Sequence, residues 1–359
     1  MRRRNILLSL VLPLALGGCI TSNPTYCEDP ATCSETDGIL SAGDDLAQTS
    51  QDLATTASDL AGPTQDMSMA ALDLSKPGPS AIIRFDRKVT IGRANIDIIV
   101  IGPSDDGKEI TKKGAPLPWV LLSPGFSTDH KQYQGYGDRL ASYGIVTILQ
   151  KSPSEWNHAT YRDETVQLIT WLLNPSGMGA DRLSGRLDKD RLGLVGHSLG
   201  GKISFLVAQN DMRVKALLGI DPVDQRDPTA VSGMAKLKLP SGVAIGYLGE
   251  TISKAGVMPC APANSNYEVM YKASPAPAFS ITFAGAAHMD FVDNPASCFN
   301  CGFCTGSTAP KDRTNALAIK YTTAYFLSTI GGDRRAQDTL SGTLFQKDVT
   351  AGYVTREAK

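Results

Sequence analysis

The clearest chemical signature in the sequence is Gly196-His-Ser-Leu-Gly200, a G-x-S-x-G motif. The residues before it, Arg191–Gly196, predict a strand, and those after it, Leu199–Gln209, predict a helix. In such a strand–turn–helix elbow the serine hydroxyl stands clear of the backbone at a helix N-terminus, where N–H groups can stabilise an oxyanion. Glycine is needed on both sides because side chains would clash in so tight a turn. Ser198 is therefore the candidate nucleophile.

A serine nucleophile needs a general base, and the chain has four histidines: His130, His158, His197 and His288. Chains that carry this elbow place the triad in the order serine, acid, histidine. Two of the histidines precede Ser198, and His197 is its neighbour in the elbow and cannot turn back onto it. His288, just after a predicted strand, is the remaining candidate for the base.

The triad acid is one of six carboxylates between Ser198 and His288. Asp221 ends the predicted strand after the elbow, and Glu250 ends the following one. The carboxyl ends of parallel strands are where α/β sheets place their chemistry. We expect Asp221 to be the acid, with Glu250 as the runner-up and Asp224 as a third candidate.

An oxyanion hole requires two backbone N–H donors. Leu199, the residue after the nucleophile, supplies one. The loop after the predicted strand Trp119–Ser123 would supply the other, and there the N–H of Phe126 is the candidate. The Phe126 ring would form a wall of the acyl pocket or, alternatively, pack in the core.

These residues are positioned by a pattern of apolar strands alternating with helical segments, which predicts an α/β fold. We expect one catalytic domain over residues 80–359, with a mostly parallel central sheet and helices on both faces. Strands are predicted at 119–123, 145–149, 191–196, 214–220, 243–248 and 279–283, and helices at 133–143, 164–173, 199–209 and 313–330.

The first nineteen residues predict a secretory signal rather than part of the domain. Three arginines precede an apolar run that is too short to be a stable transmembrane helix. Leu16-Gly-Gly-Cys19 resembles the cleavage box of bacterial lipoproteins, in which the cysteine is lipidated. We therefore expect a lipid anchor at Cys19. Ile20 is not the aspartate that retains lipoproteins in the inner membrane, which favours the outer membrane of the cell envelope.

Residues 20–79 predict a disordered acidic tether. They contain ten acidic residues against one lysine, and one aromatic residue. Asp45, Asp52, Asp59, Asp66 and Asp73 are seven residues apart, and each is followed by Leu or Met. A coiled coil is the alternative, but its second apolar position is filled by the small residues Ser50, Ala57, Thr64 and Ala71, and Gly62-Pro63 interrupts the repeat.

Cysteine usage fits an oxidising compartment. Cys27 and Cys33 are expected to pair within the tether. Cys260, Cys298, Cys301 and Cys304 are expected to form two disulfides that brace the loop after His288. The alternative is a metal or iron–sulfur site, because Cys298-x-x-Cys301-x-x-Cys304 has ligand-like spacing.

The overall composition excludes other classes of function. Among 359 residues, 35 are basic and 36 acidic, so the net charge of −1 gives no reason to expect nucleic acid as a partner. Hydrophobic residues make up 42%, enough for a large buried core.

Residues 95–330 resemble the chlorophyllase and bacterial polyester-hydrolase (cutinase-like) branch of the α/β-hydrolases. The resemblance rests on Ser123-Pro-Gly-Phe126, Arg139-Leu-Ala-Ser-Tyr-Gly-Ile145, Gly196-His-Ser-Leu-Gly-Gly201, Gly219-Ile-Asp-Pro-Val-Asp224, Pro259-Cys-Ala-Pro262 and His288-Met-Asp-Phe-Val-Asp293. It implies serine esterase chemistry without a cofactor or metal. Asp221 matches the acid of the chlorophyllase pattern and Glu250 that of the polyester hydrolases.

The resemblance leaves the substrate open. Polyester hydrolases usually carry Trp where this chain has Val223, and plant chlorophyllases carry Arg where it has Leu199. The sequence therefore predicts a lipid-anchored serine hydrolase acting on a small or polymeric ester. An amidase or peptidase with the same triad is one alternative, and a non-catalytic surface binding protein on a hydrolase scaffold is another.

Overall fold

The computed structural model describes residues 72–174, 182–252, 259–294 and 302–359, all within the compact unit Ser68–Lys359. The proposed lipidation site Cys19, the cysteines Cys27 and Cys33, and the repeat aspartates up to Asp66 lie outside the described residues. So do Cys298 and Cys301.

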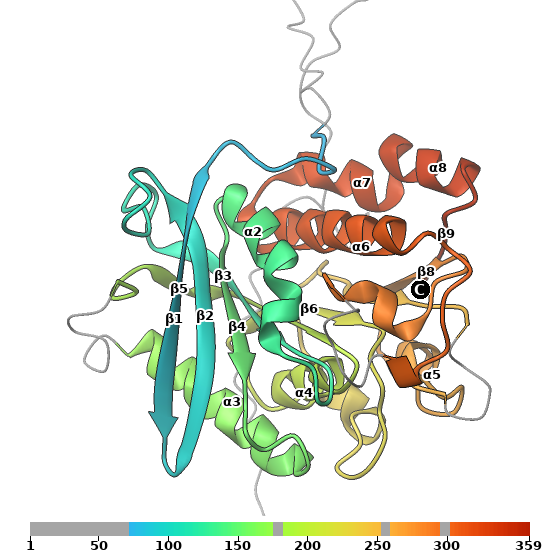
Figure 1. Cartoon of the computed structure of the whole chain (residues 1–359), viewed down its shortest axis with the longest axis horizontal. Helices are drawn as coiled ribbons and strands as arrows, with labels where there is room; N and C mark the ends of the chain where they lie inside the picture. The colour runs from blue at the N-terminus through green and yellow to red at the C-terminus, as the bar shows by residue number, and fades with distance from the viewer. Residues whose placement is uncertain (1–71, 175–181, 253–258, 295–301) are drawn as a thin grey trace, which may run out of the picture. The chain divides into compact units, whose positions relative to one another are not determined.

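In the described residues nine strands form one sheet in the order β1-β2-β4-β3-β5-β6-β7-β8-β9 (Figure 1). The six strands from β4 to β8 in this order are parallel, whereas β1, β2 and β9 pair antiparallel at the edges. The strands are β1 (Ala81–Ile91), β2 (Ala94–Ser104), β3 (Leu117–Ser123), β4 (Val146–Lys151), β5 (Leu187–His197), β6 (Val214–Ile220), β7 (Ile245–Gly249), β8 (Ala278–Phe283) and β9 (Val354–Ala358).

Helices cover both faces of this sheet, as predicted. Figure 1 shows α3 and α4 on one face and α2 and α6 on the other. Because β3 is covered on both sides, all seven of its residues are buried, which explains its continuous apolar sequence. None of the described helices is long and apolar enough to cross a bilayer. The helices are α2 (Gln134–Ser142), α3 (His158–Leu173), α4 (Leu199–Ala208), α5 (Tyr267–Ala273), α6 (Lys311–Phe326), α7 (Gln337–Ser341) and α8 (Thr343–Thr350).

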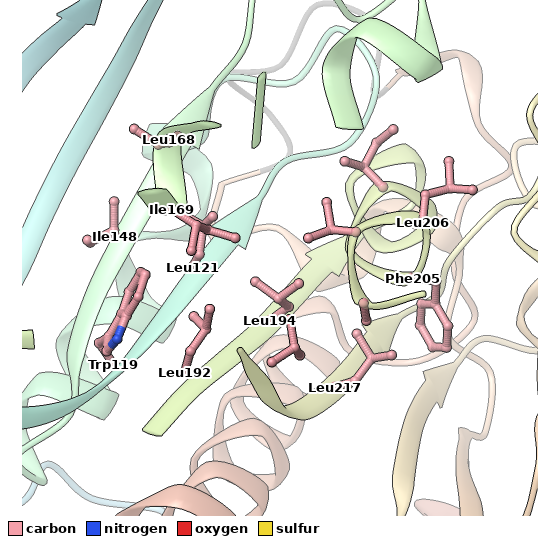
Figure 2. Close-up of a cluster of buried hydrophobic side chains, with 14 of the residues drawn as sticks. Trp119, Leu121, Ile148, Leu168, Ile169, Leu192, Leu194, Phe205, Leu206 and Leu217 are labelled. Atoms are coloured by element: carbon pink, nitrogen blue, oxygen red, sulfur yellow. The ribbon is translucent and has the colours of Figure 1, made fainter. Parts of the chain in front are cut away.

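The core on the α3–α4 side holds the elbow strand and helix in place. Trp119 of β3 and Leu194 of β5 face Leu168 of α3 and Phe205 of α4 across this layer (Figure 2). Each is at most 1% exposed. Burying large apolar side chains stabilises by about 1.5–3 kcal/mol each, so β5 and α4 are firmly anchored on both sides of the turn that carries Ser198.

The elements differ from the predicted ones mainly at their ends. Helix α3 begins at His158, six residues before the predicted start, because the Asn157 side chain caps it by accepting a hydrogen bond from the Thr160 N–H at 3.0 Å. The β1–β2 hairpin and the C-terminal strand β9 were not among the predicted strands.

Residues 72–79, which the sequence analysis placed in the tether, pack on the folded unit. Leu74 is 1% exposed. Its carbonyl accepts a hydrogen bond from the Arg139 guanidinium at 2.5 Å, and the Gly78 N–H donates to the Ser142 hydroxyl at 2.8 Å. Both partners lie on α2, so the folded unit begins before residue 80.

Candidate active site

Four candidate residues follow four neighbouring parallel strands. Ser198 follows β5, Asp221 follows β6, Glu250 follows β7 and His288 lies beyond β8. The register pairs His197 with the end of β6, and that end in turn with the end of β7. Since the carboxyl ends of parallel strands lie at one edge, the sheet brings side chains distant in sequence to one place.

The elbow holds Ser198 in a conformation that residues other than glycine seldom adopt, with φ 53° and ψ −120°. A β-carbon at Gly196 would lie 2.2 Å from the Gly200 backbone. One at Gly200 would lie 2.1 Å from the Ser123 carbonyl oxygen. Both glycines are therefore required for the close approach, as the motif predicts, and Ser198 is held at the start of α4.

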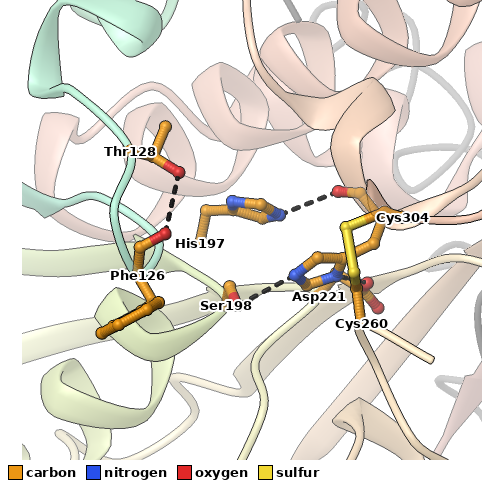
Figure 3. Close-up of a disulfide and its surroundings, with 8 residues drawn as sticks. Phe126, Thr128, His197, Ser198, Asp221, Cys260 and Cys304 are labelled. Carbon is orange, nitrogen blue, oxygen red and sulfur yellow. Dashed lines mark hydrogen bonds and ion pairs between the residues drawn. A yellow bond between two sulfur atoms is a disulfide. The ribbon is translucent and has the colours of Figure 1, made fainter. Parts of the chain in front are cut away.

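The structure brings together the three residues predicted as the triad, and Figure 3 labels Ser198 and Asp221 among them. The Ser198 hydroxyl lies 2.9 Å from Nε2 of His288, and Nδ1 of His288 lies 2.5 Å from Oδ2 of Asp221. A carboxylate only accepts, so Nδ1 carries the ring proton. Nε2 then presents its lone pair to Ser198, which is the arrangement for removing the hydroxyl proton.

Burial sets the protonation state of His288, the candidate base. His288 is 3% exposed, and burial lowers its pKa from 6.5 to about 4. The imidazole is therefore neutral at pH 7 and can accept a proton. The Asp221 carboxylate, 0% exposed, favours the imidazolium once it forms.

The two other candidate acids make supporting contacts. The Glu250 N–H donates to Oδ1 of Asp221 at 3.3 Å, and its carboxylate accepts from the Ile252 N–H. Asp224 lies 3.4 Å from the Lys202 ammonium and accepts from two backbone N–H groups, those of Ala230 and Val231. Asp221 is thus the carboxylate that contacts the imidazole of His288, and the Glu250 N–H helps to hold Asp221 in place.

The predicted oxyanion donors border a cavity of about 380 Å³ that also contains Ser198 and His288. The loop after β3 passes close to the elbow: a β-carbon on Gly125 would be 3.3 Å from Cβ of Ser198. No described residue accepts a hydrogen bond from the N–H of Phe126 or of Leu199. The Phe126 ring is 39% exposed, so it forms cavity wall rather than core.

Tyr133 and His197 connect the loop after β3 to His288, a link that was not predicted from the sequence. His197 donates from Nε2 to the His288 carbonyl at 2.9 Å, and its Nδ1 accepts from the Tyr133 hydroxyl at 2.8 Å. That hydroxyl accepts from the Gly125 N–H at 3.2 Å. The His197 ring also packs against His288, with 4.6 Å between ring centroids. Only the place of His197 within the elbow hinted at this role.

We expect Tyr133→Phe to lower both stability and turnover. It leaves the buried Nδ1 of His197 and the Gly125 N–H without their partner, which costs about 1–3 kcal/mol. The measurement is the free energy of unfolding in urea, together with kcat on an ester. Tyr325→Phe is the matched control, because that buried hydroxyl donates to the Ala244 carbonyl and accepts from the Leu217 N–H, away from the cavity. If Tyr133→Phe lost as much stability as the control but kept its kcat, the hydrogen bonds from Tyr133 through His197 to His288 would not contribute to catalysis.

A disulfide joins Cys260 to Cys304, and both residues border the cavity (Figure 3). This is one of the pairings left open by the sequence. Cys304 is therefore not available as a thiolate ligand for the metal or iron–sulfur site that was the alternative interpretation of Cys298-x-x-Cys301-x-x-Cys304. The bridge ties the segment after β7 to the chain beyond His288.

Comparison with known proteins identifies the family. A family model described as Chlorophyllase matches residues 87–339. The chain belongs to the chlorophyllase family. With the elbow after the fifth strand and the mostly parallel sheet, this chlorophyllase-family chain has the α/β-hydrolase fold, as predicted from the sequence.

Individual relatives include chlorophyllases and cutinases, the two groups of the branch that the sequence resembles. Chlorophyllase-1 of Arabidopsis thaliana is 34% identical over 214 residues, which are 53% of this chain and 63% of that protein. Chlorophyllase-2 of the same plant is 26% identical over 196 residues, 49% of this chain and 61% of that protein. Cutinase 1 of Thermobifida cellulosilytica is 28% identical over 103 residues, 29% of this chain and 38% of that protein. The chain thus spans less than two thirds of the length of these relatives.

Proposed function

We propose that this chlorophyllase-family protein is a serine-dependent carboxylic ester hydrolase that works through an acyl-enzyme. The observation that carries the proposal is the continuous hydrogen-bonded path from Ser198 through His288 to Asp221, which opens into a cavity. The names of the relatives, which include cutinases and a bis(hydroxyethyl) terephthalate hydrolase, support ester chemistry.

The mechanism follows from the geometry. Ser198 attacks the ester carbonyl as His288 takes its proton, and Asp221 stabilises the imidazolium. The N–H groups of Phe126 and Leu199 donate to the oxyanion. When the tetrahedral intermediate collapses, the C–O bond to the alcohol breaks and His288 gives its proton to the leaving oxygen. Water, deprotonated by His288, then attacks the acyl-enzyme and releases the acid.

The experiment that tests the proposal compares an ester with its amide. Purified protein is given p-nitrophenyl butyrate and, separately, the p-nitroanilide of butyric acid. We expect turnover of the ester and little or none of the anilide, whose leaving group is much poorer. Faster hydrolysis of the anilide would favour the amidase alternative. Absence of both activities, with no labelling of the folded protein by a fluorophosphonate, would favour the non-catalytic binding protein.

We also propose that the protein is a lipoprotein of the cell envelope, anchored in the outer membrane through Cys19. The support is the sequence alone: the basic start, the short apolar run and Leu16-Gly-Gly-Cys19, followed by Ile20. Two or more acyl chains, at about 0.8 kcal/mol per buried CH₂, would give stable membrane binding.

Cys19→Ser should abolish the incorporation of radiolabelled palmitate in a diderm bacterial host and release the protein from the membrane fraction. Cys27→Ser is the matched control, because it removes a cysteine a few residues away and should leave the label in place. Equal labelling of both variants would reject the anchor at Cys19.

A further inference from the structure

The cavity has two chemically different ends, on opposite sides of Ser198. One end holds Met289 and the Cys260–Cys304 disulfide, next to His288. The other holds Phe126, His158 and Arg226. Figure 3 shows the labelled Phe126 and the disulfide on opposite sides of Ser198. No aspartate or glutamate of the described residues lines the cavity.

Arg226 is the one charged residue among the described residues that line the cavity. Its guanidinium lies over the Trp156 ring, 5.1 Å from the ring centroid, and Trp156 in turn meets the Phe126 ring edge-on at 4.5 Å. Trp156 is 68% exposed and Arg226 is also exposed, so this stack lies at the protein surface, beside the part of the cavity that Phe126 lines. Among the described residues no carboxylate forms an ion pair with the Arg226 guanidinium. Asp227, next in the chain, is exposed and makes no ion pair with it.

A fully buried cation supports this end of the cavity. Lys202 of α4 is 0% exposed, and its ammonium donates to the carbonyls of Gln225 and Arg226, each at 2.5 Å. Asp224, at 3.4 Å, offsets the charge of Lys202. Arg226 itself has φ 63°, an uncommon conformation for a residue other than glycine. The hydrogen bonds from Lys202 therefore hold the backbone of Gln225 and Arg226 in place.

His158 adds a neutral donor. Its Nδ1 lies 3.0 Å from the Lys202 ammonium. An ammonium has only donors, so Nδ1 accepts and the ring proton is on Nε2. Burial, and then the charges of Lys202 and Arg226, lower the pKa of His158 to about 4, so the ring stays neutral at pH 7. This end of the cavity thus contains donors and a cation without a carboxylate to neutralise Arg226.

We propose that this end is a binding site for an anionic group on the acyl part of the substrate, with Arg226 as the specificity residue. The preferred substrate is then an ester whose acyl chain ends in a carboxylate, that is, a half-ester of a dicarboxylic acid. The inference rests on the proposed ester hydrolase function.

The chemistry of the leaving group assigns the acyl part to this end. His288 must deliver its proton to the leaving oxygen, so the alcohol lies on the His288 side, towards Met289 and the disulfide. The acyl chain then extends the other way from the carbonyl carbon, along Phe126 to Arg226. A carboxylate there would form a charge-assisted hydrogen bond with the guanidinium.

The experiment compares mono-p-nitrophenyl suberate with p-nitrophenyl octanoate, which has the same chain length and no carboxylate. In suberate the carboxylate is too far from the ester to assist its hydrolysis by forming a small ring. The preference is the kcat/KM for the half-ester divided by the kcat/KM for the neutral ester. We expect Arg226→Gln to lower this preference about tenfold, by raising the KM for the half-ester. Arg226→Lys should retain part of the preference. Sodium chloride should weaken the preference of the wild type.

Arg334→Gln is the matched control, because it removes the same charge from an exposed position in the turn before α7. Its ratio should equal that of the wild type. If Arg226→Gln leaves the ratio unchanged while the neutral ester is hydrolysed, the anion site is rejected and the esterase function stands.

Binding to the Ser198→Ala variant provides a second measurement that does not depend on turnover. Calorimetric titration with the half-ester should show affinity that falls about tenfold on adding Arg226→Gln. If neither ester is hydrolysed by the wild type but this binding difference appears, the esterase function fails and the anion site stands. Equal binding by both variants rejects the site.

Discussion

Ser198→Ala lowers kcat for p-nitrophenyl butyrate on the order of 10⁶-fold and leaves the fold intact. The magnitude is that of losing the nucleophile of a triad, after which only the oxyanion donors and binding contribute. The fold should persist because alanine removes one oxygen at a cavity-lining position, and the glycines that permit the turn remain. Initial rates and the free energy of unfolding, measured on the same preparation, test both parts.

Ser204→Ala is the matched control for the same helix. That hydroxyl is buried and donates to the Gly200 carbonyl at 2.9 Å, away from the cavity. It should leave kcat within a few-fold of the wild type, and labelling by a fluorophosphonate should persist. Labelling should vanish in Ser198→Ala. If Ser198→Ala retained more than a thousandth of wild-type turnover, beyond any contaminating activity, Ser198 would not be the nucleophile.

The parallel part of the fold could be predicted because its residues are buried on both faces. Strands such as β3 and the end of β5 are continuous apolar runs in the sequence, and their order along the chain implies the α/β class. Strand β1 lies at the sheet edge, where exposed residues alternate with more buried ones. It was not predicted, because its sequence contains no continuous apolar run. The start of α3 depends on one capping side chain, Asn157, which apolar periodicity does not detect.

The three triad candidates could be chosen from sequence because parallel strands bring their carboxyl ends to one edge. The contacts that support the triad could not be predicted from the sequence. The path from Tyr133 through His197 to the His288 carbonyl joins three elements through side-chain hydrogen bonds. The placing of Lys202 beneath Arg226 likewise depends on the course of the loop after β6, for which no local pattern exists. Such contacts follow from tertiary packing alone.

Asp221→Asn should lower kcat about 10⁴-fold with little change in KM. An asparagine Nδ2 donates where the carboxylate accepts, so Nδ1 of His288 becomes the acceptor and the ring proton moves to Nε2. Nε2 then cannot take the proton of Ser198. Asp221 has φ 41°, a region that asparagine tolerates almost as well as aspartate, so the backbone should be preserved. Steady-state kinetics with p-nitrophenyl butyrate give kcat and KM separately.

Glu250→Gln is the comparison that decides between the two acids. Glu250 contacts Asp221 through its backbone N–H, which the substitution leaves in place. Its side-chain oxygen can still accept from the Ile252 N–H as an amide carbonyl. We therefore expect a loss in kcat of about tenfold or less, because only the hydrogen bond between the residue 250 side chain and the Ile252 N–H becomes weaker. If Glu250→Gln cost as much as Asp221→Asn, the negative charge that stabilises the His288 imidazolium would have to be shared between the two buried carboxylates. The hydrogen bond from Nδ1 to Asp221 would then orient the ring without supplying most of its electrostatic stabilisation.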